Sequence, residues 1–327
     1  MFVFGRRSVL KFDGEVAIVT GAGRGLGRAH ALMLASRGCK VVVNDLGVKS
    51  TGALTEQNPA GDVVREIEQN GGIAVEDRHN VVTDSGSIVE TALQKFGQLD
   101  IVVNNAGVLN DLPFDEISPE RWHASADVHV KGTVEVCRAA WPHLKRSKVA
   151  RIVNTTSSAM FGNAGVTSYC TAKGAIFAFT RSLALEARPL GINVNGIMPS
   201  AWTRMTATMN DEIVLEALRQ HFQPERVSAL VAWLVHPTTD VWNEIFRVSG
   251  HGASRVVITT TESTIVDEVT PESWAEKADE LMRKKELFPL YSTLDSFERE
   301  LKEAVPGIDL SATYATGGNT ITLGKGD

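Results

Sequence analysis

Short runs of apolar, largely β-branched residues recur from residue 11 to about residue 250, and each gap between two runs is long enough for one helix. Runs that are apolar at every position are typical of strands buried on both faces of a parallel sheet. The runs that predict strands are 16–19, 41–43, 73–75, 101–103, 152–153, 192–197 and 245–248. Strands and helices in alternation predict a doubly wound α/β fold, with a mostly parallel seven-stranded sheet, helices on both faces and ligands at the carboxyl ends of the strands.

Helical periodicity is clearest in apolar positions spaced by four, three and four residues, which share one face of a helix: Ala172, Ile176, Phe179 and Leu183. The Pro-Leu-Gly sequence at 189–191 predicts the end of this helix. The segment 120–145 predicts a second long helix.

Two regions interrupt the alternation. The segment 46–61 is rich in Gly, Ser and Thr, which predicts a long surface loop before a helix that starts near Asp62. The segment 200–223 follows a strand and mixes large apolar with polar residues, so it is either a mobile lid or an ordinary helical insertion.

The chain is predicted to have three parts: a leader (1–10), a Rossmann-fold domain (11–252) and a C-terminal extension (253–327). Within the extension, 256–260 predicts a strand, and Thr270 would cap a helix over 271–285. The extension is expected to pack on the core, to act as a lid or to cover a partner subunit.

The 327 residues are 43% apolar and 22% charged, with a net charge of −6, which indicates a globular protein with a large core rather than a disordered chain. The basic clusters 145–148 and 283–285 are too small for a surface that binds nucleic acid. No apolar run approaches the roughly 20 residues needed to cross a bilayer. Cys39, Cys137 and Cys170 form no close pair and the histidines are scattered, so we expect a reducing cytoplasm and no metal site.

A glycine-rich turn at 20–27, Thr-Gly-Ala-Gly-Arg-Gly-Leu-Gly, follows the first predicted strand and opens a helix. Glycines allow positive φ and let backbone N–H groups approach a pyrophosphate at the helix N-terminus. The second strand ends at Asp45, 18 residues after Gly27, where a carboxylate can accept both ribose hydroxyls of NAD and repels the 2′-phosphate of NADP. Arg24 could pair with that 2′-phosphate and so favour NADP. A flexible arginine at an exposed position stabilises such a pair less than the repulsion between the phosphate and Asp45 destabilises it, so the sequence predicts NAD.

Two further groups of residues point to chemistry at the same edge of the sheet. The Asn-Asn-Ala-Gly sequence at 104–107 ends the fourth strand, and its small residues and carboxamides suit the close approach of a ribose or adenine. Ser157 precedes Tyr169 and Lys173, which open the amphipathic helix. Because residues four apart share a helix face, the Lys173 ammonium can lie near the Tyr169 phenol and favour the phenolate that a general base requires.

From residue 11 to about 250 the chain resembles the short-chain dehydrogenase/reductase family in motifs that stand in the family's order: 20–27, 104–107, Ser157 and the pair of Tyr169 and Lys173. Within the family, four segments look like the dehydrogenase module of peroxisomal multifunctional enzyme type 2, which oxidises (3R)-hydroxyacyl-CoA, and its bacterial single-module relatives: 42–47, 128–132, 138–142 and 246–250. The resemblance implies an oxidoreductase that transfers a hydride between NAD and a secondary alcohol or ketone, foremost a 3-hydroxyacyl-CoA.

The resemblance also implies roles for single residues. Tyr169 would take the substrate hydroxyl proton, Lys173 would bind the nicotinamide ribose, and Ser157 would donate a hydrogen bond to the substrate oxygen. His129 stands in place of the asparagine of the family's proton relay, as in the type 2 enzymes, or is simply a packed helix residue. The implied cofactor contacts are Gly21, Arg24, Gly25, Leu26, Gly27, Asp45, Asn80, Val81, Asn105, Ala106, Gly107, Tyr169, Lys173, Pro199 and Thr203.

Two positions depart from the family's pattern. Thr156 holds the family's usual separation of 13 residues before Tyr169, while Ser157 keeps register with the preceding strand, so we predict Ser157 as the catalytic hydroxyl, with Thr156 and Ser158 as alternatives. Asn80 falls where the family usually has an aspartate beside the adenine, so that contact is changed.

The substrate stays open between two kinds of alcohol. Large apolar side chains in the predicted lid favour a steroid or another bulky alicyclic alcohol: Trp202, Met205 and Met209. A CoA ester would need cations at the mouth of the pocket, for which the candidates are Arg204, Arg219 and Arg226. A nucleotide-sensing subunit without catalysis is a third hypothesis, against which the intact Tyr169 and Lys173 argue.

The family resemblance further implies a homodimer or homotetramer formed through the helices at 120–145 and 170–187. The sequence shows neither a hydratase module nor a C-terminal Ser-Lys-Leu signal, which leads us to expect a free-standing cytosolic enzyme.

Overall fold

The computed structural model describes residues 9–48, 57–109, 112–203, 206, 211–283, 285–293, 296, 299–300 and 302. The chain divides into two compact units, 1–255 and 256–327. No helix among the described residues is both long and apolar enough to cross a bilayer.

One eight-stranded sheet forms the centre of the first unit, in the strand order β3-β2-β1-β4-β5-β6-β7-β8. Its strands are β1 (Val16–Thr20), β2 (Lys40–Asn44), β3 (Ile73–Asp77), β4 (Ile101–Asn104), β5 (Arg151–Thr155), β6 (Asn193–Ser200), β7 (Ile245–Ser249) and β8 (Gly252–Arg255). All neighbours run parallel except β7 and β8. The predicted doubly wound fold is confirmed, and so are its seven parallel strands. The predicted strand count was one short, because β8 is exposed at every residue and has no apolar run.

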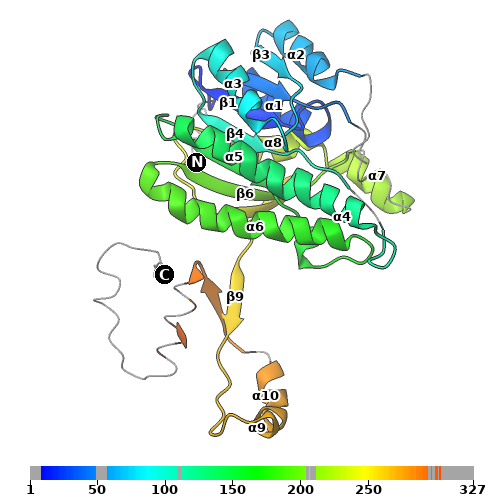
Figure 1. Cartoon of the computed structure of the whole chain (residues 1–327), viewed down its shortest axis with the longest axis vertical. Helices are drawn as coiled ribbons and strands as arrows, with labels where there is room; N and C mark the ends of the chain where they lie inside the picture. The colour runs from blue at the N-terminus through cyan, green and yellow to red at the C-terminus, as the bar shows by residue number, and fades with distance from the viewer. Residues whose placement is uncertain are drawn as a thin grey trace, which may run out of the picture. The chain divides into compact units, whose positions relative to one another are not determined.

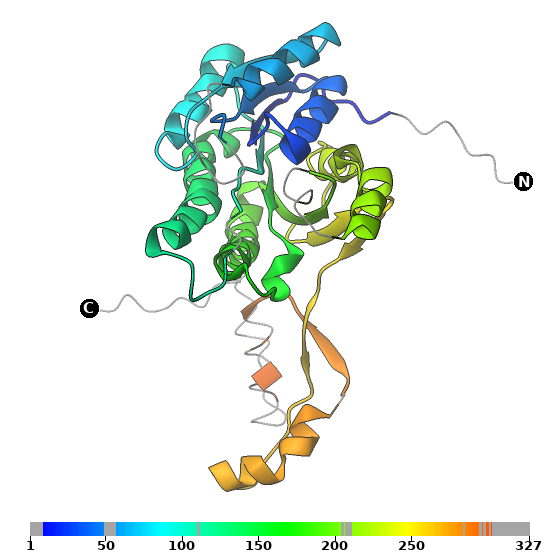
Figure 2. The same ribbon diagram turned by 90° about the vertical axis from the view of Figure 1, so that its right-hand side faces the viewer.

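Helices cover both faces of this sheet (Figures 1 and 2). On one face lie α1 (Gly25–Ser36), α2 (Pro59–Gln69) and α8 (Pro224–Leu234), and on the other lie α3 (Ser85–Phe96), α5 (Gly132–Leu144) and α6 (Thr167–Ala187). Successive strand residues serve opposite layers: Val19 belongs to the core beneath α1, and Ile18 belongs to the core beneath α5. This explains why the strands are apolar at every position.

The predicted long helix at 120–145 consists of α4 (Pro119–Ala126), a π-helical turn η1 (Asp127–Lys131) and α5. The π-turn carries the buried His129, and such turns are frequent at functional sites. The predicted helix start near Asp62 was wrong. Asn58 caps α2 through the Gly61 N–H and Pro59 takes the first helical position, so this helix begins at Pro59.

The predicted helical insertion after β6 contains α7 (Glu212–His221), which Asp211 caps. Whether 200–223 acts as a lid stays a prediction, since 204–205 and 207–210 lie outside the described residues.

The second unit holds a two-stranded antiparallel sheet of β9 (Ile258–Thr261) and β10 (Leu287–Leu290). Two short helices, α9 (Pro271–Glu276) and α10 (Ala278–Met282), stand where the sequence predicted one. The predicted cap is present, because the Thr270 hydroxyl accepts the Ser273 N–H at 3.1 Å. The role predicted for this extension stays a prediction.

Candidate active site

The glycine turn between β1 and α1 has a backbone that side chains would block. Gly21 and Gly25 have φ of +62° and +53°, in the left-handed region that favours glycine. A Cβ on Gly21 would lie 2.8 Å from the Ala106 Cα, and a Cβ on Gly27 would lie 2.2 Å from the Gly21 oxygen. The N-cap residue of α1, Arg24, makes no capping hydrogen bond with its side chain. The turn therefore offers backbone N–H groups at close range, which suits an anionic ligand.

The end of β4 is tied to this turn. The Asn105 side chain donates to the carbonyl oxygens of Thr20 and Gly21, at 3.0 and 3.1 Å. The Thr20 hydroxyl in turn accepts the backbone N–H groups of Asn105 and Ala106. Since β1 and β4 are neighbours at the point where the strand order reverses, these bonds fix the crevice in which such folds bind ligands.

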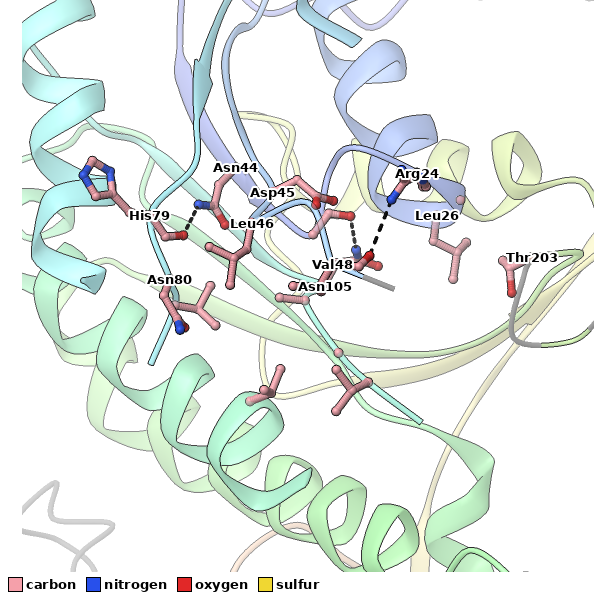
Figure 3. Close-up of a pocket in the computed structure, with 17 residues that line it drawn as sticks. Arg24, Leu26, Asn44, Asp45, Leu46, Val48, His79, Asn80, Asn105 and Thr203 are labelled. Atoms are coloured by element: carbon pink, nitrogen blue, oxygen red, sulfur yellow. Dashed lines mark hydrogen bonds between the residues drawn. The ribbon is translucent and has the colours of Figure 1, made fainter. Parts of the chain in front are cut away.

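The Asp45 carboxylate follows β2 directly and accepts two backbone N–H groups, from Gly23 at 2.9 Å and from Gly47 at 2.8 Å. Arg24 bonds instead to the Gln57 side chain. At 3.5 Å it also bonds to the Val48 carbonyl oxygen (Figure 3). The guanidinium is thus engaged by the loop after β2.

A pocket of about 250 Å³ lies above the turn, and we call it the glycine-turn pocket. It brings together eleven of the predicted cofactor residues: Gly21, Arg24, Gly25, Leu26, Asp45, Asn80, Val81, Asn105, Ala106, Gly107 and Thr203 (Figure 3). Gly27 does not line the pocket and instead lets α1 approach the turn. The sequence analysis did not assign six lining residues to the cofactor site, although three of them stand in the segments 42–47 and 128–132: Asn44, Leu46, Val48, His79, Val108 and Val128.

A larger cavity of about 890 Å³ lies beside it, and we call it the Tyr169 cavity. It contains the other predicted site residues, Ser157, Tyr169, Lys173, His129 and Pro199. The two cavities share part of their walls, namely Leu26, Asn105, Gly107 and Thr203. A ligand in the glycine-turn pocket can therefore extend to the side chain of Tyr169.

Tyr169 and Lys173 lie on one face of α6, as their spacing predicts. The Lys173 Nζ is 5.7 Å from the centroid of the Tyr169 ring and donates to the Thr155 carbonyl oxygen at 2.7 Å. Lys173 is only 4% exposed, and burial lowers its pKa from 10.5 to about 7. An amine in this state gains or loses its proton near neutral pH.

The three candidate hydroxyls differ in their surroundings. Thr156 is buried and donates to the Lys173 carbonyl oxygen at 2.9 Å, so its hydroxyl is used within the fold. Ser158 is exposed. Ser157 is half-buried on the cavity wall, and its oxygen accepts the Ala159 N–H at 3.1 Å, which leaves the hydroxyl hydrogen for a ligand. This geometry favours Ser157.

His129 lies on the cavity wall behind Tyr169, with the two ring centroids 5.3 Å apart in an edge-to-face arrangement. Its Nε2 lies 2.7 Å from the Val108 carbonyl oxygen and 3.2 Å from the Val108 backbone nitrogen, so it can donate to the first or accept from the second, depending on the tautomer. Burial and the charge of Lys173 lower the pKa of His129 to about 3, so the ring is neutral. Its Nδ1 is buried and has no hydrogen-bond partner among the described residues.

The arginines considered for the cavity mouth have partners. Arg219 pairs with Glu212 and Glu216 and stacks on the Trp202 ring at 5.0 Å. Arg226 contacts Gln223 and His251. The remaining candidates, Arg204, Met205 and Met209, lie outside the described residues.

A family model described as short chain dehydrogenase matches residues 15–213. Peroxisomal multifunctional enzyme type 2 of Mus musculus is 44% identical over 242 residues, which are 74% of this chain and 32% of that protein. The chain thus spans about a third of the length of this relative.

Two solved structures are similar over most of the first unit. A short chain dehydrogenase from Mycobacterium avium superposes with a TM-score of 0.74 at 36% identity, covering 86% of this chain and 98% of that one. A 7α-hydroxysteroid dehydrogenase complexed with NADH and 7-oxo glycochenodeoxycholic acid has a TM-score of 0.66 at 30% identity, covering 74% of this chain and 95% of that one.

The chain therefore belongs to the short-chain dehydrogenase family, and the predicted resemblance to the type 2 multifunctional module is confirmed. It is an oxidoreductase that acts on CH–OH groups, as members of this family do with a nicotinamide cofactor.

Proposed function

We propose that the protein is an NAD-dependent dehydrogenase whose substrate is a 3-hydroxyacyl-CoA. The observation that carries the proposal is the position of Tyr169 and the buried Lys173 in a cavity that opens into the glycine-turn pocket. A phenol beside a buried amine is suited to take a proton from an alcohol at the place where a bound dinucleotide would end.

The residues of the glycine-turn pocket fit a dinucleotide. The backbone of the turn approaches its neighbours so closely that a Cβ on Gly21 or Gly27 would clash. Such a bare backbone suits a pyrophosphate. Asp45 stands where the ribose of the adenosine half would lie, and its charge favours NAD over NADP. Arg24 does not oppose this preference, because its guanidinium is already bonded to the loop after β2.

NAD⁺, when bound, would supply the hydride acceptor, C4 of the nicotinamide ring. Tyr169 accepts the hydroxyl proton of the substrate as the carbinol carbon loses its hydride. Protonated Lys173, the form present below its pKa of about 7, stabilises the phenolate, and the Ser157 hydroxyl donates a hydrogen bond to the substrate oxygen. In the reverse direction Tyr169 returns the proton to the alkoxide.

We assign His129 a supporting part in this proton transfer. The ring is neutral and its buried Nδ1 has a free hydrogen-bonding position, so His129 can hold a water molecule near Lys173 but cannot act as a cationic acid.

Two observations bear on the substrate. The named activity of relatives as multifunctional enzymes and hydratase-dehydrogenase-epimerases supports an acyl-CoA. A steroid is the second candidate, since the Tyr169 cavity has largely apolar walls, among them Leu109, Val166, Val214 and Leu218, and a steroid dehydrogenase is a structural neighbour. Arg219 and Arg226 already have partners, so neither supplies an unpaired cation for a phosphate of CoA.

The test is a substrate panel followed by the absorbance of the reduced cofactor. We expect turnover of a (3R)-hydroxyacyl-CoA with NAD⁺, little turnover with NADP⁺, and none with the (3S) epimer. Turnover of steroid alcohols alone would move the assignment to the second candidate. Absence of reduced cofactor with every alcohol, together with absence of NADH binding, would overturn the proposed function. The cytosolic location and the homo-oligomer stay predictions.

A further inference from the structure

Asp77, the last residue of β3, is a buried carboxylate that the proposed chemistry does not use. Its side chain is 1% exposed. One oxygen accepts the Asn44 side chain at 2.7 Å and the His79 backbone N–H at 3.1 Å. The other oxygen accepts the His79 ring Nδ1 at 2.9 Å and the Thr91 hydroxyl at 2.7 Å. Four donors converge on one carboxylate.

These donors belong to elements that border the glycine-turn pocket. Asn44 immediately precedes Asp45, and its side chain also donates to the His79 carbonyl oxygen at 2.9 Å (Figure 3). His79 begins the segment 79–81, and all three of its residues line the pocket. Thr91 comes from α3 and does not line it. Asp77 therefore ties the 79–81 segment to the end of β2.

The 79–81 segment lines the glycine-turn pocket but not the Tyr169 cavity, so it lies at the end of the site away from the chemistry. A dinucleotide whose nicotinamide faces Tyr169 would place its adenosine half there. We propose that Asp77 is a positioning residue of the cofactor site, which holds the 79–81 segment against β2 and so sets the affinity for the adenosine half. This inference rests on the proposed function.

The electrostatics of Asp77 agree with a preorganised support. Burial alone would raise its pKa, but the hydrogen bonds from His79, Thr91 and Asn44 outweigh burial and keep the pKa below its ordinary value. The carboxylate is thus ionised at neutral pH and accepts from every donor. Removing it would deprive the buried side chain of Asn44 of one of its two acceptors and would free the His79 ring, whose side chain is 48% exposed.

The experiment compares Asp77→Leu, which removes both acceptors and keeps a side chain branched at the same atom, with Asp77→Asn, which keeps the oxygen that faces Asn44 and the His79 N–H. Asp77→Leu should raise the KM for NAD⁺ about tenfold or more, and should weaken AMP binding by a similar factor, with kcat within about twofold. Asp77→Asn should restore most of the affinity. AMP is the probe because it carries the adenosine half alone.

Thr91→Val is the matched control, because it removes a donor to Asp77 from a helix that does not line the pocket. We expect it to lower the melting temperature slightly and to leave both KM and AMP affinity within about twofold. If Asp77→Leu does not fold, His79→Phe replaces it. The His79 ring is half-exposed, and loss of its bond to Asp77 should raise the KM for NAD⁺ about threefold.

Unchanged KM and AMP affinity in Asp77→Leu, or in His79→Phe where that variant is used, would overturn the inference and leave Asp77 a purely structural residue. Equal loss of affinity in Thr91→Val would do the same. A wild-type protein that binds neither NADH nor AMP would instead overturn the proposed function, so the two failures are distinguishable.

Discussion

The glycine-turn pocket is shaped by backbone, whereas the Tyr169 cavity depends on buried titratable side chains. In the pocket, Gly21 and Gly27 allow contacts that any Cβ would prevent, and Asp45 accepts backbone N–H groups. In the cavity, Lys173 and His129 are almost fully buried, and burial lowers the pKa of both. The comparison teaches that binding here relies on shape, while reactivity relies on the cost of burying charge.

The largest effect should follow from filling the backbone contact in the pocket. Gly27→Ala places a Cβ 2.2 Å from the Gly21 oxygen, so α1 must shift away from the turn. We expect a loss of NADH affinity of about a hundredfold or more, measured by fluorescence titration. Gly86→Ala is the control, since nothing lies within 4 Å of its Cβ. Equal affinities in the two variants would contradict a pocket shaped by backbone approach.

An intermediate effect should follow from removing the one carboxylate of the pocket that the sequence predicted to face the cofactor. Asp45→Ala should reduce the ratio of kcat/KM for NAD⁺ to that for NADP⁺ by about tenfold, because the ribose loses its acceptor and the 2′-phosphate loses a like charge. Arg24→Gln is the comparison. If the ratio is unchanged in Asp45→Ala but changes in Arg24→Gln, then Arg24 and not Asp45 discriminates between NAD⁺ and NADP⁺.

The last effect concerns stability rather than binding, and it belongs to the cavity. The pKa of Lys173 is about 7 in the fold and 10.5 ordinarily, so between these values the unfolded chain binds a proton that the folded chain does not. Stability contributed by Lys173 therefore rises with pH from about 7 to about 10.5 and is lost below about 7. Lys173→Met removes this dependence.

Urea unfolding at pH 6, 8 and 10 tests the sign. We expect the stability of Lys173→Met relative to wild type to be greatest at pH 6 and to fall by a few kcal/mol by pH 10. A difference that stays constant, or that grows with pH, would show that the buried amine is not held neutral by the fold.

Much of the pocket could be predicted because its requirements are local in sequence. The glycines of 20–27 and the position of Asp45 directly after a strand are enough to predict the backbone geometry of the turn. Some residues missed there, such as His79 and Val128, line the pocket only because distant elements meet. The start of α2 was missed for a different reason, since the Asn58 cap stands inside a polar stretch that resembles a loop.

The cavity was predictable in its residues but not in its electrostatics. The spacing of Tyr169 and Lys173 predicted their shared face, yet the burial that lowers the pKa of Lys173 comes from packing between β5 and α6. The sequence predicted Ser157 from its register with the preceding strand, and the hydrogen bond from the Thr156 hydroxyl to the Lys173 carbonyl oxygen adds a reason that the sequence could not supply. The neutral state of His129 follows from a π-turn that periodicity does not show.

The central claim is tested most directly by single-turnover kinetics of Tyr169→Phe, with the enzyme in excess over a (3R)-hydroxyacyl-CoA and saturated with NAD⁺. The account predicts that reduced cofactor forms about 10²–10⁴ times more slowly than in wild type, while the dissociation constant for NADH is unchanged. Formation of reduced cofactor at the wild-type rate would contradict it.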